Sequence, residues 1–417
     1  MLITLPEDIL TTIVNDKSSV QGNLYGHIRD DGDVIQIAGV TPDTGSLVGN
    51  WQIETSLPDK PVDIQSLPII LVMQKDEANP PKVQAYYHDT RNWMLSEVMV
   101  IRRFADFDAR IKGLFEVGKL AYKRVTIIGL GTGGAVVAAQ LVRCGVGNFR
   151  LVDFDRLEVH NIARHVCDLR DIGRYKTRAL RDLLINTSPF VQVETYEVNI
   201  LADLVQLEEI IEGSDLVVAA TDSEESKMAI NQVCWQRGIP AVYGAAYNRA
   251  FGGDVFRVAS STDACYACFH TVVAEFFGPP PAATDDFSPG YADPSKMADL
   301  IAEPGLAMDA GMIALILTRV ALLTLLRDVQ TSLPDFTSNW ILFGNRAEWI
   351  FQKPLESIFI DVPKRSDCPV CNYTAYASSN LGMSVDQARE NAQQILQELP
   401  QIDISSRIHP HYDNEDR

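Results

Sequence analysis

The sequence predicts an α/β fold in which a doubly wound, Rossmann-like and mostly parallel sheet follows a small, β-rich α+β domain. From residue 125 onward, apolar strand-like runs alternate with segments of helical periodicity, which is the pattern of a parallel sheet. A glycine cluster separates the first of these strands from the first helix, and the second strand ends in two aspartates. A strand, a glycine turn, a helix and an acid-tipped strand form a unit suited to hold a nucleotide.

The whole-chain composition limits the classes of partner. The chain has 417 residues, enough for two or three domains, and a formal net charge of −19 without a Lys/Arg-rich run. We therefore expect neither nucleic acid nor a membrane surface as the principal partner. The N-terminus has no signal-peptide pattern, and the apolar stretch at 311–326 contains Arg319, which favours a buried helix. Cysteine spacing indicates a reducing compartment, so we expect a cytoplasmic protein.

Residues 1–115 are expected to form a non-catalytic α+β domain that serves docking or dimer contacts. Strand-like runs at 22–28, 34–40, 51–55, 68–73, 83–87 and 94–100 are separated by turn signals. Their order, with the early run GNLYGH, is similar to a degenerate JAB/MPN-type domain. The H-x-H pair of such a zinc hydrolase is absent, and His27 and His88 stand alone.

The segments that follow are predicted from their periodicity. Residues 99–123 read as one amphipathic helix leading into the nucleotide-binding strand. Further helices are expected at 177–186, 202–212 and 224–237, and further strands at 191–198, 216–219 and 241–244. Runs at 253–259, 340–344 and 349–352 indicate additional strands, some of them antiparallel.

Two segments are predicted to lie outside this regular pattern. Residues 278–305 are rich in proline and poor in bulky apolar side chains, which is typical of a long irregular connection. The acidic tail at 374–417 is expected to hold one short helix, capped by Ser384 with Gln387 three residues later. Such a helix usually docks on its own domain, and recruitment of a partner is the alternative.

Four of the seven cysteines predict a metal site. Cys265 and Cys268 form one C-x-x-C pair, and Cys368 and Cys371 form a second pair about a hundred residues later. Four thiolates suit a tetrahedral zinc ion and leave no position for water, so we expect a structural zinc that staples the end of the chain to its middle.

The residues after the glycine turn point to the chemistry. The turn glycines alone do not distinguish NAD from ATP. Cations that close over phosphates stabilise the charge that develops when a carboxylate attacks an α-phosphate, and an acid at the end of a neighbouring strand suits magnesium. The residues concerned are Gly129, Gly131, Gly133 and Gly134 of the turn, Asp153 and Asp155 after the second strand, then Asn161, Arg164, Lys176 and Asp222.

Taken together, the runs GLGTGG, LVDFDRLEVHNIARH, GRYK and AATDS with the two C-x-x-C pairs resemble the ThiF/MoeB superfamily, the adenylation domain of ubiquitin-activating (E1-like) enzymes. The resemblance covers roughly residues 105–373 and implies an adenylation domain at 116–373, which pairs as a homodimer. It implies that ATP and Mg²⁺ are used to adenylate the C-terminal glycine carboxylate of a ubiquitin-like or sulfur-carrier protein, with release of pyrophosphate. A conjugating enzyme would be a further partner.

The resemblance also implies roles for single residues. The glycine turn and Asp155 would lie at the nucleotide, and Asp153 would hold the ribose. Asn161, Arg164 and Lys176 would contact phosphates, and Asp222 would hold magnesium. The four cysteines would hold zinc, and residues 278–305 would be the crossover loop over the carrier's tail. Either Arg103 or Arg110 would be the arginine finger.

The sequence departs from the family pattern in three places. His165 stands where glutamine is common, and the interval from Asn161 to Lys176 is about one residue short. Residues 278–305 contain no cysteine, so adenylation would be the only covalent step unless Cys167 serves as a nucleophile. Three alternatives stay open at this point: a sulfur-carrier adenylyltransferase, an NAD-dependent oxidoreductase and an inactive scaffold.

Overall fold

The computed structural model describes residues 1–16, 18–58, 69–74, 81–88, 92–277 and 305–373, together with Ser384 and Gln387. The chain divides into two compact units, Met1–Arg110 and Ile111–Arg417. Each unit has a hydrophobic core of its own. The division falls five residues before the predicted domain boundary at 115.

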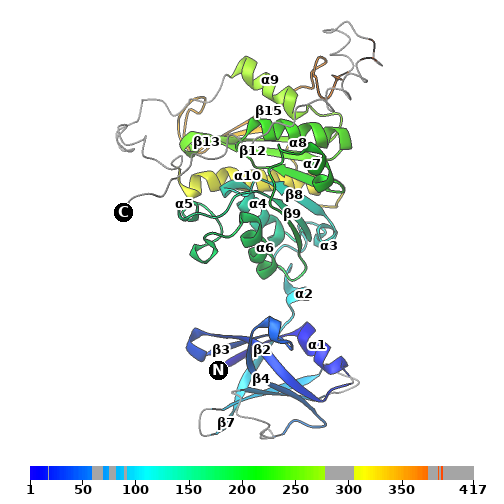
Figure 1. Cartoon of the computed structure of the whole chain (residues 1–417), viewed down its shortest axis with the longest axis vertical. Coiled ribbons are helices and arrows are strands. Elements are labelled where there is room, and N and C mark those ends of the chain that lie inside the picture. Colours follow the sequence, from blue (N-terminus) through cyan, green and yellow to red (C-terminus); the bar gives the residue numbers. More distant parts are fainter. Residues whose placement is uncertain are drawn as a thin grey trace, which may run out of the picture. The chain divides into compact units, whose positions relative to one another are not determined.

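The first unit is a closed barrel (Figure 1). Around the barrel the strands follow the order β1-β3-β2-β4-β5-β6-β7, and α1 (Glu7–Asn15) follows β1. Its strands are β1 (Leu2–Pro6), β2 (Gln21–Arg29), β3 (Val34–Gly39), β4 (Ser46–Glu54), β5 (Ile69–Gln74), β6 (Lys82–His88) and β7 (Trp93–Ile101), with short turns η1 (Asp30–Gly32) and η2 (Pro42–Thr44). The six predicted strands are present. The seventh, β1, closes the barrel by pairing in parallel with β7.

The single helix predicted over residues 99–123 is wrong. Strand β7 continues to Ile101, which pairs with Pro6 of β1, so sheet pairing overrides the local periodicity. Only two short helices follow, α2 (Arg103–Asp106) and α3 (Val117–Leu120). Between them Gly113 has φ 96°, a left-handed conformation that interrupts an α-helix.

The second unit contains an eight-stranded mixed sheet, ordered β10-β9-β8-β11-β12-β13-β14-β15. The first five strands are parallel, and the last three are antiparallel. The strands are β8 (Arg124–Ile128), β9 (Asn148–Val152), β10 (Gln192–Tyr196), β11 (Leu216–Ala219), β12 (Ala241–Ala246), β13 (Gly252–Val258), β14 (Trp340–Gly344) and β15 (Glu356–Ile360). The predicted doubly wound sheet is therefore present, with an antiparallel extension.

Helices cover both faces of this sheet (Figure 1). Alternate strand residues feed two cores: Val125 and Ile127 of β8 belong to one, and Ile128 to the other. The helices of the first core are α4 (Thr132–Arg143), α6 (Lys176–Thr187) and α10 (Ala307–Leu325); those of the second are α7 (Leu204–Ile211), α8 (Glu224–Arg237) and α9 (Tyr266–Phe276). Short elements complete the unit: α5 (Val159–Ile162), η3 (Leu169–Asp171) and η4 (Asn248–Ala250).

Two further predictions concern the C-terminal half of this unit. The predicted strand at 349–352 is wrong: Trp349 has φ 58°, outside the β region, and the edge strand is instead β15. The helix predicted at 311–326 is α10. Among the described residues, only α10 is long and apolar enough to cross a membrane by length and composition, and 61% of its most apolar window is buried here.

The predicted loop and tail lie almost wholly outside the described residues. Of residues 278–305, only Gly305 is described. In the tail, the Ser384 N–H donates to Gln387 Oε1 at 3.1 Å, and the Gln387 N–H donates to Ser384 Oγ at 3.3 Å. These reciprocal bonds are the predicted helix cap.

Candidate functional site

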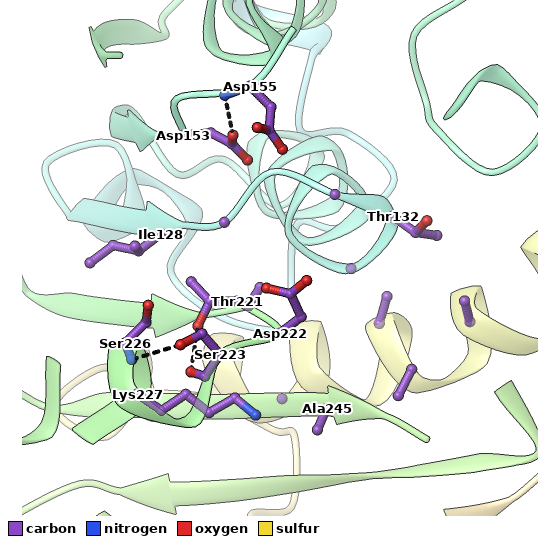
Figure 2. Close-up of a pocket in the computed structure, with 18 of the residues that line it drawn as sticks. Ile128, Thr132, Asp153, Asp155, Thr221, Asp222, Ser223, Ser226, Lys227 and Ala245 are labelled. Carbon is purple, nitrogen blue, oxygen red and sulfur yellow. Dashed lines mark hydrogen bonds between the residues drawn. The ribbon is translucent and has the colours of Figure 1, made fainter. Parts of the chain in front are cut away.

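The candidate site is a pocket at the carboxyl ends of the parallel strands. The chain winds from β8 to β9 and β10 in one direction and from β11 to β12 in the other, so the winding reverses between β8 and β11. Ligands of open α/β sheets bind at such a reversal. A pocket of about 840 Å³ lies there, lined by the glycine turn, the ends of β9, β11 and β12, and α10. Figure 2 shows its two facing walls.

Two glycines of the turn are required by close packing, and two others line the pocket. Gly129 has φ 87°, and a Cβ there would lie 2.7 Å from the Ala220 carbonyl oxygen. A Cβ on Gly134 would lie 1.9 Å from the Gly129 oxygen, so both positions need glycine for packing. Gly131 and Gly133 line the pocket with open space beside them, which lets a ligand approach the backbone. Gly134 is not among the lining residues, and its predicted contact with a nucleotide is untested.

Asp153 organises the turn from the end of β9. Its Oδ2 accepts the Leu130 N–H at 2.7 Å, and its Oδ1 accepts the Asp155 N–H at 2.8 Å (Figure 2). Burial raises the pKa of the Asp153 carboxyl, while nearby Lys176 and these two backbone bonds oppose that rise. The carboxylate lines the pocket and still has acceptor capacity for a ribose hydroxyl.

The two predicted cations Arg164 and Lys176 both line the pocket, as Asp153 does. Lys176 begins α6 and is only 8% exposed. Its Nζ lies 2.7 Å from Asp155 Oδ2, so the ammonium is paired with a carboxylate in this structure. The structure thus gathers Asp153, Asp155, Arg164 and Lys176 in one place.

Besides Gly134, three further predicted site residues are not among the lining residues of the pocket. The Asn161 side-chain oxygen accepts the Glu158 N–H at 2.9 Å, which caps α5. Arg103 and Arg110 lie in the first unit, where Asp8 binds Arg103 through two hydrogen bonds of 2.5 and 2.9 Å. Their predicted roles stay predictions.

Asp222 lies on the opposite wall, three residues after the end of β11 at Ala219 (Figure 2). The next residue, Ser223, caps α8: its Oγ accepts the Ser226 N–H at 3.2 Å. This cap fixes where α8 begins, and Asp222, two residues before that helix, lines the pocket. A carboxylate there is chemically suited to bind magnesium.

Sequence reasoning missed two cations that line the pocket, Lys227 and Arg249. Lys227 is 2% exposed, and its Nζ lies 2.9 Å from Glu224 Oε1. It shares a helix face with the buried Ile230 and Cys234, so a lysine inside an apolar stripe was the available signal. Arg249 has φ 56° and pairs with Glu348 at 2.5 Å. Left-handed non-glycine residues cluster at functional sites, but sequence does not reveal such a conformation.

The four predicted cysteines converge. Sulfur–sulfur separations are 3.5 Å between Cys265 and Cys368, 3.4 Å between Cys268 and Cys371, and 3.9 Å between Cys265 and Cys268. All four sulfurs lie within 4.8 Å of one another. A tetrahedral zinc with bonds of about 2.3 Å requires separations of about 3.8 Å, so the cluster fits a metal ion. The Arg365 N–H also donates to Cys268 Sγ at 3.4 Å.

The surroundings of Cys167 do not favour a nucleophile. Its side chain is 5% exposed, and burial together with Asp171 raises its pKa to about 12. Reactive cysteines have a lowered pKa and some exposure, because the thiolate is the reacting form.

Comparisons with known proteins show which family the chain belongs to. The sequence model of the ThiF family matches residues 108–344. The ubiquitin-like modifier-activating enzyme 5 of Caenorhabditis elegans is 28% identical over 204 residues, covering 46% of this chain and 49% of the relative. The SAMP-activating enzyme E1 of Haloferax volcanii is 29% identical over 258 residues, which cover 61% of this chain and 82% of that relative. The chain thus spans about half the length of the first relative.

A solved structure of E. coli MccB with ATP is 19% identical to this chain. The superposition covers 61% of this chain and 68% of the MccB chain, with a TM-score of 0.47.

Proposed function

Because the chain belongs to the ThiF family, we propose that it activates the C-terminal carboxylate of a small carrier protein by adenylation. The carrier would be a ubiquitin-like protein, and a sulfur-carrier protein is the alternative. The observation that carries the proposal is the pocket at the β8/β11 reversal, where open glycines, cationic side chains and carboxylates meet. The relatives named above as modifier-activating enzymes support it.

The pocket residues suit ATP as a substrate. Gly131 and Gly133 leave the backbone open for phosphates next to the N-terminus of α4, which favours negative charge. Arg164 and Lys176 would hold phosphate oxygens, and Asp153 would hold the ribose. Asp222 would hold Mg²⁺, which supplies charge neutralisation at the phosphates. The carrier's carboxylate then attacks the α-phosphorus in line, and pyrophosphate leaves.

This reaction places few demands on acid–base chemistry. A C-terminal carboxylate is already ionised at neutral pH, so no general base is required. The side chains contribute by positioning the reactants and stabilising charge on the phosphate oxygens. Adenylation is the only covalent step in this proposal, because the one cysteine considered as a nucleophile, Cys167, is buried with a raised pKa.

The decisive experiment is carrier-dependent ATP–pyrophosphate exchange, measured with a panel of purified ubiquitin-like and sulfur-carrier proteins that end in glycine. We expect exchange with one of them and its loss in Asp222→Ala. The exposed Asp361, in the same unit, provides the control variant Asp361→Ala. Exchange that persists in Asp222→Ala would remove Asp222 from the mechanism.

The same preparation tests the rival classes. ATP with Mg²⁺ should raise the melting temperature, whereas NAD should not. Stabilisation by NAD alone would support an oxidoreductase, and binding of ATP without exchange would support a scaffold. Mass spectrometry of the carrier after incubation would identify the adenylate. The proposal has four further parts, each with its own test. Metal analysis tests for zinc in the cysteine cluster, and cell fractionation tests for a cytoplasmic location. Light scattering tests for a homodimer, and a pull-down tests for a conjugating enzyme as partner.

A further inference from the structure

One residue of the glycine turn is held by side chains on both sides of its backbone. Leu130 lies between Gly129 and Gly131, and its side chain is fully buried. Its N–H donates to Asp153, and its carbonyl oxygen lies 3.0 Å from His165 Nε2. The turn is therefore tied both to the end of β9 and to the segment after α5.

The hydrogen bond at Nδ1, the other ring nitrogen of His165, determines which nitrogen carries the proton. The Cys167 N–H donates to His165 Nδ1 at 3.1 Å, so Nδ1 is an acceptor and carries no proton. Nε2 then carries the proton and donates to the Leu130 carbonyl. Both bonds exist together only in this neutral tautomer.

The position of His165 in the chain connects these bonds to the pocket. The preceding residue is Arg164, which lines the pocket, whereas His165 does not. The Arg164 and His165 N–H groups both donate to the Asn161 carbonyl at 2.9 Å, so the two residues share one backbone turn. Fixing His165 against Leu130 therefore fixes the distance between the glycine turn and the backbone of Arg164.

We propose that neutral His165 is a positioning residue that holds the glycine turn and Arg164 in register, so that both bind the same nucleotide. The inference rests on the proposed function, because it assumes that the pocket binds ATP. Protonation of Nδ1 would place two N–H groups against each other and break the bond from Cys167. Nucleotide affinity should therefore fall when His165 becomes charged.

The groups around the ring agree with a neutral histidine. Burial lowers the pKa of His165, the Leu130 bond raises it, Lys176 of α6 lowers it and Asp171 of η3 raises it. Because the folded-state pKa is lowered, the neutral ring is favoured above about pH 6.5, the ordinary histidine pKa. Its contribution is lost as the pH falls through the folded-state pKa, which lies below that value.

Two substitutions separate positioning from general stability. His165→Ala removes both hydrogen bonds, and we expect affinity for ATP to fall about tenfold at pH 7.5. The carrier's KM should stay unchanged. His165→Gln keeps an amide N–H for Leu130 and an amide oxygen for Cys167, without a titratable group. It should restore affinity at pH 7.5 and abolish the extra weakening of wild type between pH 7.5 and 5.5.

Isothermal titration of the full-length protein with ATP and Mg²⁺ at several pH values makes this test. His160→Gln is the matched control, because His160 lies in α5 and does not line the pocket. Comparing variants at each pH cancels titration of the nucleotide and of Asp153. If wild type binds no ATP, the proposed function fails and the inference falls with it.

If wild type binds ATP and His165→Ala binds equally well, only the inference is overturned. The inference also fails if His165→Gln shows the same pH dependence as wild type. That second comparison decides the question alone if His165→Ala does not fold.

Discussion

Single residues in this molecule show that chemical type alone does not define a role. Cys167 follows the proposed phosphate-binding Arg164 by three positions, which made it a candidate nucleophile. Its side chain, however, packs among Leu157, Ala179 and neighbouring apolar groups. Burial there keeps the thiol protonated at neutral pH, because its pKa is about 12.

Removing the Cys167 thiol should leave the chemistry intact. Cys167→Ala retains the backbone N–H that donates to His165 and deletes one small buried group. We expect carrier-dependent ATP–pyrophosphate exchange within about twofold of wild type, since exchange differences reflect transition-state stabilisation that the thiol does not provide. Non-reducing mass spectrometry should show no carrier thioester in wild type. A thioester that disappears in Cys167→Ala would identify Cys167 as the nucleophile after all.

At the scale of elements, sequence signals such as helix caps predicted the helices and strands whose bounds depend on local interactions. Helix α8 was predicted with its observed bounds, because Ser223 caps its start and Gly238 ends it with φ 65°. Barrel closure could not be predicted, since the parallel pairing of β1 with β7 joins residues about 95 positions apart. The convergence of the four cysteines followed from their spacing and ligand chemistry. Lys227 pairs with Glu224 of its own helix, but the same carboxylate also takes part in a contact between α8 and α9 that periodicity does not encode.

That contact between α8 and α9 links the metal-binding segment to the wall of the pocket. Tyr266 lies between Cys265 and Cys268, and its hydroxyl donates to Glu224 Oε2 at 2.8 Å. The other oxygen of Glu224 accepts from Lys227, a pocket residue. One carboxylate thus receives a donor from each helix.

Tyr266→Phe should weaken this link without removing a metal ligand. Glu224 would lose one donor while keeping Lys227, so we expect the free energy of unfolding to fall by about 1–2 kcal/mol. Urea denaturation measures the change, and Tyr122→Phe, at a side chain that is 85% exposed, is the control. Equal unfolding midpoints for Tyr266→Phe and wild type would show that the bond contributes nothing to stability.

At the scale of the whole molecule, the two units have separate cores. The barrel encloses its own apolar interior, whereas the α/β unit has a core on each face of its sheet. The cysteine cluster belongs to the second unit and joins α9 to the chain after β15. A metal ion there would stabilise only the unit that contains it.

Differential scanning calorimetry of the intact chain should therefore resolve two transitions. Removing the metal with a chelator should lower the melting temperature of the α/β transition and leave the barrel transition in place. Metal content measured before and after treatment is the necessary control. A single transition that moves as a whole would indicate that the units unfold together, and no movement on metal loss would argue against a structural metal.

If nucleotide binds as proposed, the ion pair between Lys176 and Asp155 would make its binding an exchange of counter-ions. The ammonium already has an anionic partner at 2.7 Å, so a phosphate that binds it would compete with that carboxylate oxygen for its charge. A released Asp155 would then be available to attract a cation at the same edge of the pocket. Because one attraction replaces another, added salt screens the pair that is lost as well as the pair that is gained. Asp155 therefore holds the Lys176 ammonium at the pocket lining, in the position where a substrate phosphate would bind it.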